Sequence, residues 1–173
     1  TILGNMTVGY GSTISPGASP GILAQTGSQV WGYGGSYNWQ MLDAIGAAGT
    51  GFDQLAISGT LSIGSGFNLN LWSLSGIGPD TNGNALNFNG DADGFWVIAS
   101  AAGGLLGADN LAFVNVNTGS VNGTGGFTNS VSGTFTVVQG NGTRGTVNDV
   151  VLVYTVPEPT VAGLALAALV TGA

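Results

Sequence analysis

The sequence predicts an all-β fold, and three observations support this prediction. Apolar residues alternate with small or polar ones from Leu55 to Leu71, the period-two pattern of strands with one buried face. Glycine contributes 33 of the 173 residues, and clusters of Gly, Asn, Ser and Asp separate the apolar stretches, as turns require. About ten short strands at this spacing indicate a β-sandwich or jelly-roll-like domain, with a β-solenoid as the alternative.

The strands follow from the alternation and its interruptions. Glycines at positions 59, 64 and 66 divide Leu55–Leu71 into two or three strands. Only Leu42–Ala48 in the body has a helical pattern, and its flanking glycines count against a helix. The other predicted strands are Ile2–Val8, Ile22–Thr26, Gln29–Tyr33, Tyr37–Asp43, Ala85–Phe88, Phe95–Ala99, Leu111–Val116, Val131–Val138 and Val147–Val156.

A six-residue repeat keeps the solenoid alternative open. Leu55, Leu61 and Phe67 recur every six residues, as in the turns of a hexapeptide β-helix, although an interrupted hairpin gives the same spacing. Ser15-Pro16-Gly17 is echoed by Ser19-Pro20-Gly21, so the solenoid interpretation is strongest for the N-terminal part.

The C-terminal end differs from the body, which we place at residues 1–156. Pro157 and Pro159 end the last strand because proline donates no hydrogen bond to a sheet. The 14 residues Thr160–Ala173 are uncharged and rich in Ala and Leu, which predicts a short hydrophobic helix. At about 21 Å, this helix is shorter than the ~30 Å apolar core of a bilayer.

Two segments of the chain resemble known families. Val156-Pro157-Glu158-Pro159 followed by an apolar segment resembles the PEP-CTERM sorting signal of bacterial surface proteins, here in a truncated or processed form without its basic end. That resemblance implies handling by an exosortase-type enzyme and an extracellular or cell-surface location in a bacterium.

The body resembles the C-terminal part of autotransporter-associated β-strand repeat proteins. The resemblance lies in Ser15–Gly21, Trp31–Trp39, Gly49–Leu55 and Gly59–Leu61. It implies secretion, an all-β body and a role at the cell surface or in a biofilm matrix, with no catalytic residues to transfer.

The composition excludes several functions. One cationic residue and a net charge of −7 argue against binding a nucleic-acid backbone. The chain lacks cysteine and histidine, so it has neither thiolate nor imidazole chemistry, and we predict that it is not an enzyme and uses no cofactor.

Two groups of residues are candidate binding sites. Trp31, Tyr33, Tyr37 and Trp39 occupy odd positions and would share one strand face, where they either stack on a polysaccharide or, as we favour, pack in the core. Asn89, Asp91 and Asp93 alternate before Gly94, a spacing that suits Ca²⁺ but equally suits a turn.

The scarcity of charge indicates self-association. Natural sheets protect their edges with lysines and other charges, and this chain has no lysine. We therefore expect a secreted, non-catalytic structural subunit that assembles with copies of itself into a filament or surface layer, by strand addition or by burial of the tail. The alternatives are a polysaccharide-binding or adhesion module and a membrane-anchored surface protein whose span continues beyond Ala173.

Overall fold

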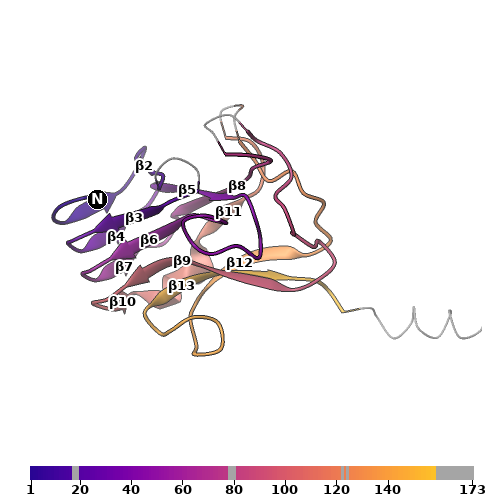
Figure 1. Cartoon of the computed structure of the whole chain (residues 1–173). Helices are drawn as coiled ribbons and strands as arrows, with labels where there is room; N and C mark the ends of the chain where they lie inside the picture. Colours follow the sequence, from indigo (N-terminus) through magenta and orange to yellow (C-terminus); the bar gives the residue numbers. More distant parts are fainter. Residues whose placement is uncertain (17–19, 78–80, 122, 124, 159–173) are drawn as a thin grey trace, which may run out of the picture.

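The computed structural model describes residues 1–16, 20–77, 81–121, 123 and 125–158 (Figure 1). Its elements are β1 (Met6–Val8), β2 (Thr13–Ile14), β3 (Ile22–Gln25), β4 (Gln29–Trp31), β5 (Ser36–Met41), β6 (Gln54–Ile57), β7 (Leu61–Ile63), β8 (Asn68–Ser73), β9 (Gly94–Ala101), β10 (Leu105–Leu106), the 3₁₀ helix η1 (Ala108–Phe113), β11 (Asn115–Asn117), β12 (Thr134–Gln139) and β13 (Asp149–Thr155). The prediction of an all-β body is confirmed. The predicted C-terminal helix lies outside the described residues.

The strands form three sheets, through which the chain passes in turn. Sheet I has the order β1-β4-β7-β10, sheet II the order β11-β8-β5-β2, and sheet III the order β12-β13-β9-β6-β3. All neighbours in sheets I and II pair in parallel, as do β3, β6 and β9 in sheet III. Successive turns of the chain therefore stack on one another, as the left side of Figure 1 shows.

This pairing corrects the preferred prediction of a sandwich or jelly roll, whose sheets are antiparallel. Leu55 and Leu61 lie on β6 and β7, and Phe67 directly precedes β8, so the six-residue repeat marks the passage from sheet III to sheet I to sheet II. Parallel stacking of successive turns is the pairing that the solenoid alternative implies. Alternation of apolar residues reports which face is buried and is the same for parallel and antiparallel neighbours, so it could not decide between them.

The C-terminal part of sheet III changes direction. β13 runs antiparallel to β9, and β12 runs antiparallel to β13. Six of the seven residues of β13 are buried, whereas β12 is mostly exposed. These two strands extend sheet III beyond the stacked parallel turns, and β12 is the edge strand of the sheet.

Several predicted elements differ from the structure. The doubtful helix at 42–48 is a series of turns, and 85–88 contributes only an isolated bridge between Asp43 and Leu86. The predicted strand 111–116 is divided between η1 and β11. The two-residue strands β2 and β10 were missed because two residues are too few to show alternation.

The core is narrow and rich in aromatic rings. Trp31 and Phe67 stack with centroids 4.6 Å apart and planes 5° from parallel.

The turns approach each other closely where a residue has no side chain. A Cβ on Gly35 would clash with the carbonyl oxygen of Val8. Glycine at this corner therefore allows the first and second turns to pack backbone against backbone.

Candidate functional surfaces

The four aromatic residues predicted to share a face do not form a sugar-binding platform. Trp31, Tyr37 and Trp39 are fully buried, whereas Tyr33 is 73% exposed. They lie on either side of a corner, with β4 in sheet I and β5 in sheet II, so the alternation does not continue from one pair to the other. The packing interpretation holds for the three buried rings.

The sequence analysis included Tyr33 among its candidates but missed Tyr10, the other exposed aromatic residue at this corner. Tyr10 and Tyr33 are both exposed, and each ring lies over a glycine of the following turn, Gly34 and Gly66 respectively. Both glycines have positive φ angles, 70° and 73°. Only the stacking of turns places these rings at the same corner, because no local pattern relates residue 10 to residue 33.

The three residues proposed as calcium ligands each accept a hydrogen bond from the protein. Asn89 Oδ1 accepts a hydrogen bond from the Asp91 amide at 3.0 Å, which closes a turn. Asp91 Oδ1 accepts from Ser132 Oγ at 3.0 Å, and Asp93 Oδ1 accepts from the Val156 amide at 2.8 Å. Within the described part of the chain, no group of three or more His, Cys, Asp or Glu residues is arranged to hold a metal ion. The hydrogen bonds account for these oxygens as parts of the turn and the chain exit, and the calcium site stays a prediction.

The first two residues of the Pro-Glu-Pro triplet lie directly after β13. Pro157 and Glu158 line a hollow of about 220 Å³ together with Asp91, Asp93 and Val156. The hydrogen bond that the Val156 amide donates to Asp93 holds the exit of the chain beside the start of β9. Pro159 lies outside the described residues.

Asp53 is the one carboxylate with a strongly shifted pKa among the described residues. It is fully buried, and this burial raises its pKa to about 7, although hydrogen bonds from the amides of Gly21 and Gln40 at 2.7 and 3.0 Å lower it in part. The backbone carbonyl of Asp53 accepts the indole hydrogen of Trp39 at 2.7 Å. Asp53 therefore ties three segments together, which is a structural role.

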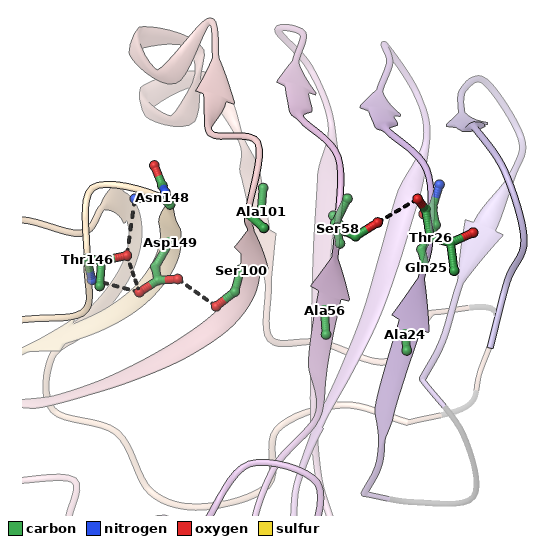
Figure 2. Close-up of a pocket in the computed structure, with 12 residues that line it drawn as sticks. Ala24, Gln25, Thr26, Ala56, Ser58, Ser100, Ala101, Thr146, Asn148 and Asp149 are labelled. Carbon is green, nitrogen blue, oxygen red and sulfur yellow. Dashed lines mark hydrogen bonds between the residues drawn. The ribbon is translucent and has the colours of Figure 1, made fainter.

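A broad groove of about 550 Å³ crosses the outer face of sheet III (Figure 2). Its floor is a row of small side chains, Ala24, Ala56 and Ser100, which occupy paired positions on β3, β6 and β9. Asp149 forms one wall and accepts hydrogen bonds from Ser100 Oγ at 2.5 Å and from the amide of Thr146 at 2.7 Å. The carboxylate of Asp149 already accepts hydrogen bonds from the protein, and the floor of the groove consists of small side chains. The groove therefore offers few groups for specific binding of a ligand.

The sheet edges are the most unusual feature of the surface. In the described chain, the strands at the two ends of the three sheets are β1, β10, β11, β2, β12 and β3. None of these strands contains a charged residue or a proline. Natural proteins normally use such residues to prevent pairing of exposed edges.

Comparisons with protein-family models, with curated proteins and with solved structures return no match to this chain. The two family resemblances therefore remain predictions. Among the described residues, no helix has the length and apolar character needed to cross a membrane.

Proposed function

We propose that this protein is a secreted, non-catalytic structural subunit that assembles with copies of itself into an extracellular filament or surface layer. The observation that carries this proposal is the absence of charge and proline from the edge strands of the described sheets. Apart from β3, whose outer edge already bonds to Ile2, each such edge presents backbone N–H and C=O groups that a strand of another subunit can pair with.

The stacking direction also supports growth in a line. β1 lies at one end of sheet I and β10 at the other, and both strands have the same direction. A subunit placed with its β1 beside β10 of the next would continue the sheet in parallel. A contact that joins one surface of a subunit to a different surface of the next continues from copy to copy unless it closes a ring. Such a contact therefore favours filaments.

The location belongs to the same proposal. The Pro-Glu-Pro triplet follows the folded body directly, where an exosortase-type enzyme would find it beyond the last strand. We place the protein outside the cell or on the surface of a bacterium. Anchoring in the membrane by a longer tail is the alternative for this part of the chain.

Sedimentation velocity and negative-stain electron microscopy of the full chain test the proposal over a range of protein and salt concentrations. We expect polymers that persist at high salt, because edge pairing does not depend on ion pairs. A single species of 17.0 kDa at all concentrations would overturn the proposal.

Polysaccharide binding remains the second candidate function, now through Tyr10 and Tyr33. Both rings are exposed at one corner of the coil, and aromatic faces suit sugar rings. Replacement of both tyrosines by alanine should abolish binding to a polysaccharide array if this function is correct. Binding that persists in the double variant would exclude this surface.

A further inference from the structure

β12 differs from the other edge strands in length and composition. It has six residues, Thr-Phe-Thr-Val-Val-Gln, whereas the other edge strands have two to four. The segment is uncharged and rich in β-branched residues, and it contains neither glycine nor proline, a composition typical of segments that pair between chains. Short strands offer few hydrogen bonds to a partner, so β12 is the edge best able to bind one.

A groove of about 520 Å³ runs along the free edge of β12. Four consecutive residues, 135–138, line one side of it. Consecutive side chains of a strand point to opposite faces, so a hollow that touches all four follows the edge of the strand. β13 occupies the other edge, and the groove therefore lies where a further strand of sheet III would lie.

The opposite wall of the groove comes from η1 and the residues that follow it. Leu111, Ala112, Val114 and Val116 form this wall. All the lining residues are uncharged, and Thr136 is the only polar one. An added strand would thus pair its backbone with β12 and bury apolar side chains against the wall, as in recognition by strand addition.

The C-terminal segment of the chain has the chemistry that this groove requires. Residues 160–173 carry no charge and consist mainly of Ala, Leu and Val. Their helix propensity is a weak preference, which pairing with an open edge can override. The strands of the body are already paired within their sheets, whereas this segment follows the last of them.

The exit of the chain shows which copy supplies the segment. Val156 donates its amide hydrogen to Asp93, which directly precedes β9. β9 and β12 lie on opposite sides of β13, so the chain leaves sheet III on the side away from the groove. A chain's own tail would therefore have to cross β13 and β12 to enter its own groove, whereas the tail of a second copy has no such crossing to make.

We propose that the groove beside β12 binds the apolar C-terminal segment, residues 160–173, of a second copy of this chain. Each subunit then has one groove and one segment, and the exchange continues from copy to copy. This inference rests on the proposed self-assembly and adds a second contact between copies to the stacking of β1 beside β10.

Matched lysine variants of the full chain test the groove. Val138 is 37% exposed and lines it, whereas Val147 is 62% exposed and lies outside it. Val138→Lys, or Leu166→Lys in the segment, should raise the concentration at which polymers form at least tenfold. Val147→Lys, which adds the same charge, should assemble like the unchanged chain. Equal assembly of the Val138 and Val147 variants would overturn the inference, provided that circular dichroism shows both to be folded.

A crosslinking experiment separates this inference from the proposed function. A photoreactive amino acid at position 166 is introduced into the full chain, and isotopically light and heavy chains are mixed before irradiation. We expect mixed light–heavy crosslinks to residues 111–116 or 135–138. Polymers crosslinked only elsewhere would overturn the groove assignment and leave self-assembly intact. Crosslinks within one chain would overturn the role of the second copy, and a monomer without groove crosslinks would overturn both proposals.

Discussion

The backbone amide of Gln40 donates a hydrogen bond to Oδ2 of the buried Asp53 over 3.0 Å. This bond, together with the one from Gly21 to Oδ1, joins the start of the second turn, β5 and the segment before β6. Burial removes water from the Asp53 carboxylate, which disfavours its charged form, and the two amide hydrogen bonds offset this effect only in part. The pKa of Asp53 is therefore raised.

Stability should therefore fall as the pH rises from about 4 to about 7. The pKa of Asp53 is about 7 in the folded chain, against 3.8 for an aspartate in water, so the folded state holds a proton in this window that the unfolded state releases. Below pH 4 both states are protonated, and above pH 7 both are ionised, so the free energy of unfolding levels off at either side. The expected loss is at most about 4 kcal/mol, from 1.36 kcal/mol for each pKa unit.

Urea unfolding between pH 3.5 and 8 measures this dependence. Asp53→Asn cannot ionise and should remove most of the slope between pH 4 and 7. An unchanged slope in this variant would show that another group titrates.

Truncation of Trp31 should destabilise the fold much more than truncation of Tyr33. Trp31→Ala removes a fully buried ring that stacks on Phe67 and should cost about 3–5 kcal/mol of unfolding free energy. Tyr33→Ala removes an exposed ring and should cost less than about 1 kcal/mol. Denaturant titration of both variants provides the comparison, and a similar loss in the two would contradict the burial that separates them.

Close stacking of turns should make Gly35 sensitive to a single methyl group. Gly35→Ala places a Cβ against the carbonyl of Val8, so the first turn must shift, at a cost of about 1–3 kcal/mol. Gly119→Ala is the matched control, because a Cβ there meets nothing within 4 Å. Thermal unfolding should show a lower Tm for the first variant only.

The acidic turn should be insensitive to calcium. Asp93 Oδ1 serves the amide of Val156, so neither added Ca²⁺ nor a chelator should change the Tm. Asp93→Ala should cost about 1 kcal/mol through the lost hydrogen bond, whereas Asp93→Asn retains an acceptor and should cost less. A rise in Tm of several degrees with millimolar Ca²⁺ would show that the turn binds calcium and would contradict this prediction.

Some strands could be predicted from the sequence pattern alone, and others could not. The alternation around Leu55–Leu71 predicted two or three strands separated at glycines, and the structure has three. The strands β3, β4, β5, β9 and β13 also lie within or overlap predicted strands. The pattern failed at 85–88 and 111–113, which form an isolated bridge and part of a 3₁₀ helix, and where Leu86 and Phe113 are exposed. It could not show that Tyr10 and Tyr33 share a corner, since that depends on which turns are neighbours.

The sequence by itself determined that the chain is all-β, poor in charge and divided into a body and an apolar tail, because composition and period-two alternation are local properties. Only the tertiary structure decided that the strands stack in parallel turns, that three of the four clustered aromatic residues are buried, and that β12 stands at an open edge beside an apolar groove. These features depend on contacts between segments such as η1 and β12, which are distant in the chain and come together only when the turns and the final strands pack.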